Sequence, residues 1–127
     1  MCAALQYRWT MCLLGAALGA GAAQAQEAVE SGLRIMTDRS SGNCIACHSL
    51  PGPGNSGSNF APALEHVGSR YDAERLRQWV VDARQINPDT LMPPFGSTQG
   101  TRQALRSAPM LSSEQIAQVV QALASWR

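Results

Sequence analysis

The sequence contains no lysine, so arginine supplies all ten of its basic side chains. Nine acidic residues nearly balance them, and the formal net charge at pH 7 is +1. Proteins that bind nucleic acid usually concentrate positive charge on one face or along one helix. The balanced charge therefore argues against a nucleic-acid partner.

The sequence also lacks an apolar run long enough to span a membrane. The run Trp9–Ala23 falls short of the roughly 20 residues that a membrane-spanning helix needs. It follows Arg8 and leads into Ala23-Gln24-Ala25, which is typical of the cleavage site of a secretory signal peptide. We therefore predict a signal peptide over residues 1–25 and one periplasmic domain over residues 26–127, free of the membrane after cleavage. A retained anchor is the alternative.

Cysteine is scarce: the chain has four, and Cys2 and Cys12 would leave with the signal peptide. Exported proteins usually hold their cysteines as disulfides, but a pair as close as Cys44 and Cys47, followed directly by His48, is better suited to form thioethers. The stretch Cys44-Ile45-Ala46-Cys47-His48 is the attachment pattern of c-type haem. Because residues three apart on a helical turn lie on the same side, we predict one covalent haem c with His48 below its iron.

Two other uses of these residues have less support. A thioredoxin-like C-x-x-C pair belongs to a βαβ context, and no strand-like alternation precedes Cys44. A structural zinc site needs a second pair of ligands, and His66 is the only other histidine, with no cysteine downstream of it.

Apolar residues recur at helical spacing in three segments, which predicts a small all-α domain. The repeats are Val29, Leu33 and Met36 in residues 27–37; Leu76, Trp79, Val80 and Ala83 in residues 72–85; and Ile116, Val119, Val120, Leu123 and Trp126 after Ser112. Asp72 opens the second helix, while Asp82 and Arg84 lie largely away from its apolar face. Ser112 and Gln115 form a capping box for the third helix. Gly32 in the first marks either a close approach by another helix or a frayed start.

Two segments between the helices are expected to be irregular loops. Leu50–Pro62 is rich in glycine, proline, serine and asparagine, and Ser97–Pro109 is polar with at most a short helical turn around residues 102–106. Pro62 has two possible roles. Its carbonyl oxygen could orient an iron-bound imidazole and raise its basicity, or the proline could simply end the loop.

Met92 stands in the stiff segment Thr90–Gly96, where two prolines follow it. Such rigidity suits an iron ligand, and a sulfur opposite His48 would give the Met/His coordination of electron-transfer cytochromes. We therefore predict Met92 as the second axial ligand. The competing candidates are Met36 and Met110.

The order of helix, C-x-x-C-H, proline-containing loop, helix, methionine and final helix resembles a class I cytochrome c over nearly all of the mature chain. More narrowly, Val67–Tyr71, Ile86–Pro93 and Pro109–Gln115 resemble the SoxX family, the monohaem subunit of the SoxAX cytochrome of bacterial thiosulfate oxidation. The resemblance implies a class I cytochrome c fold, haem attachment at Cys44 and Cys47, and iron ligation by His48 and Met92. It also implies that Pro62 is the proline whose carbonyl oxygen accepts the hydrogen bond from the proximal histidine.

The resemblance further implies a heterodimer with a SoxA-like haem subunit, which joins thiosulfate to a cysteine of a SoxY-like carrier protein, and a downstream electron acceptor. The chain itself is then a non-catalytic electron-accepting subunit of an L-cysteine S-thiosulfotransferase complex. Without lysine, it cannot present the exposed-lysine docking face of many soluble electron carriers. The alternatives are a free-standing periplasmic electron carrier and, with less support, an enzyme with an open haem.

Overall fold

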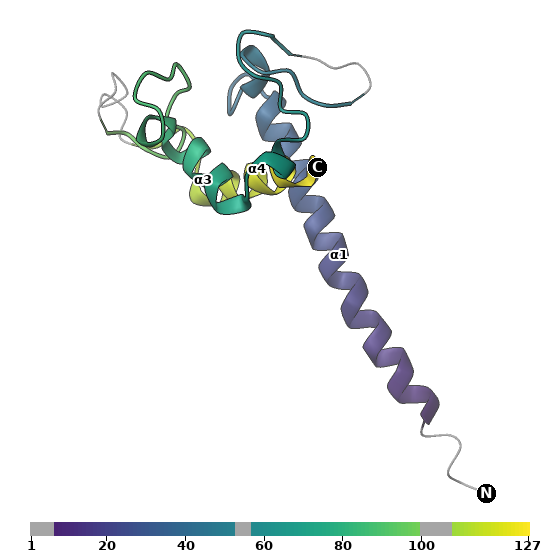
Figure 1. Ribbon diagram of the computed structural model, residues 1–127. Coiled ribbons are helices and arrows are strands. Elements are labelled where there is room, and N and C mark those ends of the chain that lie inside the picture. The colour runs from purple at the N-terminus through teal and green to yellow at the C-terminus, as the bar shows by residue number, and fades with distance from the viewer. Residues whose placement is uncertain (1–6, 53–56, 100–107) are drawn as a thin grey trace, which may run out of the picture.

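The computed structural model describes residues 7–52, 57–99 and 108–127, with side chains from Gly21 onward (Figure 1). Its elements are α1 (Tyr7–Thr37), the 3-10 turn η1 (Cys44–Ala46), α2 (Val67–Arg70), α3 (Ala73–Asp82), the 3-10 turn η2 (Ala83–Gln85) and α4 (Ser113–Ser125). Within these ranges the only β-type pairing is an isolated bridge between Ser49 and Gly57. The predicted all-α class is confirmed. The helical turn predicted around residues 102–106 lies outside the described residues.

Helix α1 ends at Thr37, as predicted, but begins at Tyr7 rather than Glu27. The residues before Glu27 are rich in alanine and contain no proline, so nothing in the leader stops the helix. Its N-terminal half extends away from the rest of the chain (Figure 1). Across the described residues, no helix combines the length and the apolar character required to cross a bilayer.

Gly32 lies where α1 crosses α4, which decides between its two interpretations. A Cβ atom at this position would lie 2.7 Å from the carbonyl carbon of Gln118 and 2.9 Å from the Cβ of Ala122. The helix runs through Gly32 without a break. The glycine is therefore a contact point between two helices and not a frayed start.

The predicted starts of α3 and α4 are confirmed by their caps. The Asp72 side chain accepts a hydrogen bond from the backbone N–H of Arg75 at 2.7 Å. Ser112 and Gln115 form the full capping box, with donor–acceptor distances of 2.9 and 3.2 Å. Both caps satisfy N–H groups that have no partner inside the helix.

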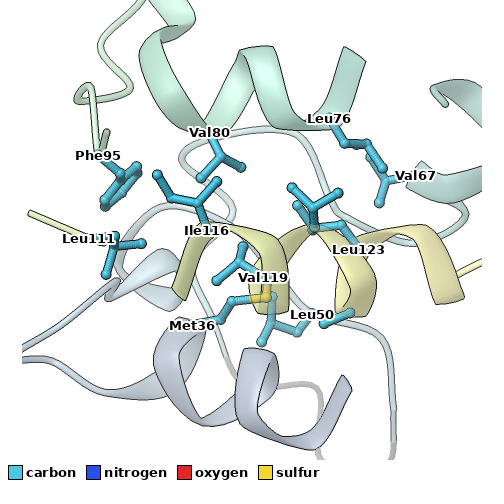
Figure 2. Close-up of a cluster of buried hydrophobic side chains, with 12 residues drawn as sticks. Met36, Leu50, Val67, Leu76, Val80, Phe95, Leu111, Ile116, Val119 and Leu123 are labelled. Atoms are coloured by element: carbon cyan, nitrogen blue, oxygen red, sulfur yellow. The ribbon is translucent and has the colours of Figure 1, made fainter. Parts of the chain in front are cut away.

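The core lies between the C-terminal half of α1, α3 and α4 (Figure 2). Its labelled side chains are Met36, Leu50, Val67, Leu76, Val80, Phe95, Leu111, Ile116, Val119 and Leu123. Burial of each large apolar side chain contributes about 1.5 to 3 kcal/mol. Because Leu50, Phe95 and Leu111 come from the connecting segments, the core also fixes the loops that carry the candidate site.

Candidate haem site

The two cysteines of the motif sit on one tight turn. The backbone N–H groups of Cys47 and His48 both donate to the carbonyl oxygen of Cys44, at 3.1 and 2.9 Å. The predicted helical turn is a 3-10 turn, in which residues three apart nearly eclipse. Both thiols are free and partly buried, which is compatible with the C-x-x-C-H attachment motif.

The thiol of Cys44 does not resemble that of a redox-active C-x-x-C pair. Burial raises the pKa of Cys44 to about 11. Thioredoxin-like enzymes need the opposite, a cysteine whose pKa is lowered so that the thiolate can attack a disulfide. The thioredoxin-like alternative therefore loses its chemical basis at this position.

The imidazole of His48 is held by the loop that follows it. Its Nδ1 atom lies 2.7 Å from the carbonyl oxygen of Pro62. Because a carbonyl oxygen can only accept, Nδ1 carries the proton and donates, which leaves the lone pair on Nε2. This is the tautomer that a metal ligand needs, and the partner carbonyl fixes the orientation of the ring.

Residues 57–64, here called the strap, run back over the motif and fix the Pro62 carbonyl in place. Three further backbone hydrogen bonds join the strap to the motif: Ser58 N–H to Ile45 O, Ala61 N–H to Cys47 O and Leu64 N–H to Ser49 O, at 3.1, 2.8 and 3.0 Å. At its start, Gly57 has a φ of +150°, and a Cβ atom at this position would overlap the His48 carbonyl oxygen. A Cβ there would lie 2.9 Å from the Cα of Ser49.

Met92 lies on a separate segment, between η2 and α4. It is partly buried and packs against the edge of the core. Its N–H group donates to the Thr90 hydroxyl at 3.2 Å, and the next residues enter the core, since Pro94 and Phe95 are buried. The loop that carries Met92 and the strap project in the same direction from the pair α3 and α4 (Figure 1).

The structure separates the two competing methionines. Met36 is 1% exposed and points into the core beside Leu50 and Val119, which leaves its sulfur surrounded by side chains (Figure 2). Met110 is partly buried and packs against the core just before α4. The structure therefore brings together Cys44, Cys47, His48 and Pro62, places Met92 and Met110 on a different segment, and assigns Met36 to the core.

The donor set fits a haem better than a zinc ion. Among the described residues, no group of three or more His, Cys, Asp or Glu side chains is placed to hold a metal ion, and His66 lies apart from the motif as the N-cap residue of α2. The Nε1 atom of Trp79 is buried and has no hydrogen-bond partner in the described part of the chain. A buried donor left unpaired costs about 1 to 3 kcal/mol, and a haem propionate offers the kind of acceptor that it lacks.

The burial of Asp82 was not predicted from the sequence. This residue ends α3 with φ −159° and ψ 91°, so the predicted helix over residues 72–85 turns there and continues only as η2. Although it lies off the apolar face, its side chain is buried and paired with Arg84. Helical periodicity describes one face of a regular helix and cannot report on a residue at which the helix ends.

Comparisons with known proteins agree with this geometry. The family model described as "Cytochrome c" matches residues 29–125. A solved structure, the crystal structure of SoxXA from P. pantotrophus, is 30% identical and matches with a TM-score of 0.69, covering 76% of this chain and 80% of that chain. No curated protein sequence matches. The family match supports a covalently bound haem c, as the C-x-x-C-H motif predicts. The chain therefore belongs to the cytochrome c family, as a SoxX-like class I cytochrome c.

Proposed function

We propose that this chain is the electron-accepting monohaem subunit of a heterodimeric, SoxAX-like sulfur-oxidising cytochrome. The observation that carries the proposal is the likeness to the SoxXA structure, at 30% identity over 80% of that chain. The partner would be a SoxA-like haem subunit, with a SoxY-like carrier protein and a downstream electron acceptor as transient partners.

Each site residue has a separate role in this proposal. Cys44 and Cys47 would form the two thioethers to the haem, and His48, through Nε2, and Met92 would hold its iron. The Pro62 carbonyl, 2.7 Å from Nδ1, keeps the imidazole in its ligating orientation. The bound haem supplies reversible one-electron chemistry, and the Met/His ligand pair leaves no open position for a substrate.

The number of electrons released indicates which subunit carries out which step. Joining thiosulfate to a cysteine thiol forms one S–S bond and releases one proton and two electrons. A subunit with one haem takes up one electron at a time, so it must pass each electron on or share the pair with the centre of its partner. The described residues contain no paired nucleophile and general base, which supports placing the bond-forming step on the partner.

Two large apolar side chains support a docking role beside the site. Phe60 lies two residues before Pro62 and is 67% exposed, and Leu91 directly precedes Met92 and is 80% exposed. Both side chains flank residues proposed to hold the haem, so they could cover its edge and border the contact with a partner. Because the chain has no lysine, we expect this contact to depend on apolar surface and arginine rather than on a lysine ring.

The proposed location is the periplasm, after cleavage behind Ala25. Haem attachment to cysteine thiols takes place outside the bacterial cytoplasm, which agrees with the signal-like composition of residues 1–25. The N-terminal residue of the mature protein would be Gln26.

Purification from the native organism tests the proposal. The expected result is a coloured complex in which this chain, shortened by its leader and heavier by one haem, elutes with a second haem-bearing subunit. A chain that elutes alone as a monomer, at every ionic strength tested, would favour the second candidate, a free-standing electron carrier. That candidate rests on the cytochrome c family match, which by itself does not require a partner.

A further inference from the structure

Asp82 is the only buried charged side chain among the described residues, with 5% of its surface exposed. It lies at the point where α3 ends and the chain turns toward the segment that carries Met92. A carboxylate removed from water is tolerated only when it is paired and hydrogen-bonded. The contacts of Asp82 therefore show which group neutralises its charge and which segment of the chain that pair holds in place.

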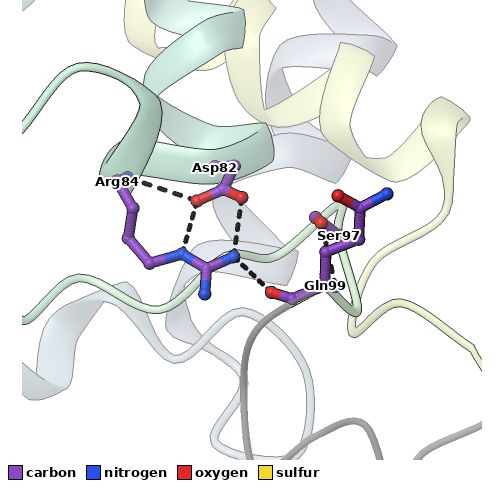
Figure 3. Close-up of polar contacts among 4 residues, drawn as sticks. All are labelled: Asp82, Arg84, Ser97 and Gln99. Atoms are coloured by element: carbon purple, nitrogen blue, oxygen red, sulfur yellow. Dashed lines mark hydrogen bonds and ion pairs between the residues drawn. The ribbon is translucent and has the colours of Figure 1, made fainter. Parts of the chain in front are cut away.

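Arg84 pairs with this carboxylate through both oxygens (Figure 3). Its Nε atom donates to Oδ1 at 2.8 Å and its Nη2 atom donates to Oδ2 at 2.7 Å. The backbone N–H of Arg84 also donates to Oδ1, at 3.2 Å, and caps η2. These bonds from Arg84 lower the pKa of Asp82. The three contacts fix the direction in which the chain leaves α3.

The Arg84 guanidinium also bonds the far end of the loop that carries Met92, at Gln99. Its Nη2 atom also donates to the carbonyl oxygen of Gln99 at 2.6 Å (Figure 3). Of the hydrogen bonds made by residues 97–99, this one alone joins them to another part of the described chain, because the Gln99 N–H bonds within the segment, to the Ser97 hydroxyl. One carboxylate and one guanidinium thus tie the start of the loop to its end.

The remaining anchors of the loop lie beside this pair. The N–H groups of Phe95 and Gly96 donate to the carbonyl oxygens of Val80 and Val81, at 3.2 and 3.0 Å. Met92 lies between the two ends, in a part of the loop held by the local bonds of Thr90 and by the prolines after it. The position of the Met92 sulfur therefore depends on whether the two ends of the loop, at Arg84 and Gln99, are held together.

We propose that Asp82 and Arg84 form a clamp that positions Met92 for iron ligation. A buried ion pair is weak evidence for stability, because removing two charges from water offsets much of their attraction. Such pairs are better attested where they select one conformation over others. The clamp does this at the base of the loop, where it acts on the backbone that carries Met92 and is therefore a positioning device. The inference rests on Met92 being the ligand.

The test compares holoprotein variants under conditions in which all of them are folded, checked by mass and by circular dichroism. Arg84→Gln removes the bidentate pair and the link to Gln99, and Arg84→Lys keeps the charge without the planar fork. Arg77→Gln is the matched control, because Arg77 lies on α3, the helix that leads into η2, and makes no hydrogen bond or ion pair within the described chain. Met92→Ala reports complete loss of the ligand.

The readouts are the charge-transfer band from sulfur to ferric iron and the rate at which carbon monoxide binds the reduced protein. Carbon monoxide enters only when the methionine has left the iron, so its rate reports the population of the displaced loop. We expect Arg84→Gln to weaken the band and to raise this rate about tenfold. Arg84→Lys should fall between Arg84→Gln and wild type, and Arg77→Gln should match wild type.

Equal rates in Arg84→Gln and Arg77→Gln would overturn the clamp while leaving Met92 as the ligand. If Met92→Ala retains the charge-transfer band, Met92 is not the iron ligand, and the proposed role of the clamp is also wrong. If Arg84→Gln does not fold with haem attached, Arg84→Lys is compared with Arg77→Lys by the same two readouts. A weaker band and a faster carbon monoxide rate in Arg84→Lys support the clamp, and equal values overturn it.

Discussion

The Nδ1 atom of His48 and the carbonyl oxygen of Pro62 lie 2.7 Å apart, across fourteen residues of chain. The hydrogen bond fixes both the tautomer and the tilt of the ring, so Nε2 is presented without further adjustment. A backbone carbonyl can perform this task only if the chain around it is rigid. The strap achieves this through its backbone hydrogen bonds to the motif and through Gly57, whose contact with His48 admits no side chain.

The first prediction concerns Gly57→Ala. A Cβ atom at a φ of +150° is strained, and here it would also meet the His48 carbonyl and the Cα of Ser49. We expect a loss of about 1 to 3 kcal/mol in the free energy of unfolding of the holoprotein. Denaturant titration followed at the haem absorption measures it.

Gly52→Ala is the matched control for this change. Gly52 also has a positive φ, +126°, but a Cβ atom there would meet nothing within 4 Å. Gly52→Ala should therefore cost only the conformational strain. Equal losses of unfolding free energy in Gly57→Ala and Gly52→Ala would show that the overlap of the new methyl group with His48 does not contribute to the loss.

The second prediction concerns the sixth iron ligand. Met92→Ala should keep the haem attached, because both thioethers remain, but it should lower the reduction potential and allow carbon monoxide to bind the reduced protein. Absorption spectra and potentiometric titration check both effects. Met110→Ala is the comparison that matters: if it abolishes the charge-transfer band while Met92→Ala retains it, the ligand is Met110.

The third prediction tests the helix crossing. Gly32→Ala raises the helix propensity of α1 by about 1 kcal/mol, yet its new methyl group would overlap the backbone of Gln118. We expect the overlap to dominate and the variant to lose about 1 to 3 kcal/mol of stability. Thermal unfolding of the holoprotein measures this.

Glu30→Ala provides the reference for Gly32→Ala. Glu30 is exposed on the same helix and makes one exposed ion pair with Arg34, at 3.3 Å. Loss of an exposed pair of this kind changes stability by only about 0.3 to 0.5 kcal/mol. A Gly32→Ala protein as stable as Glu30→Ala would mean that the two helices can move apart without cost.

The features that the sequence predicted correctly are those encoded within a few residues. Ser112 and Gln115 predict the start of α4, because both residues of the capping box lie within one turn. Asp72 does the same for α3. The attachment motif is equally local, since the turn that aligns Cys44 and Cys47 is closed by their own backbone.

The features that the sequence did not predict depend on residues far apart in the chain. Arg84 bonds the Gln99 carbonyl fifteen residues later, and a backbone carbonyl leaves no mark in the sequence. The two interpretations of Gly32 could be separated only by knowing which helix it faces. The predicted start of the first helix at Glu27 was wrong, because the helix continues into the residues assigned to the leader and begins at Tyr7.

The last prediction concerns acid. The hydrogen bonds from the Arg84 side chain hold the pKa of Asp82 below its ordinary value, which is about 3.9 in an unfolded chain. The unfolded state therefore binds this proton first as the pH falls, and the stabilisation present above about pH 4 is lost as the pH drops toward the folded-state pKa. Asp82→Asn has no such proton to bind. We expect wild type to be more stable than Asp82→Asn from pH 7 to about 5, and the difference to shrink below about pH 4.

Denaturant unfolding of both holoproteins at a series of pH values between 7 and 3 measures this difference. The pKa of Asp38 is also lowered, by hydrogen bonds from Ser40, and its contribution has the same sign. Because Asp38 is present in both proteins, its effect cancels in the comparison. A difference that stays constant down to pH 3 would mean that the carboxylate of Asp82 is no better stabilised in the folded protein than in the unfolded chain, despite its contacts with Arg84.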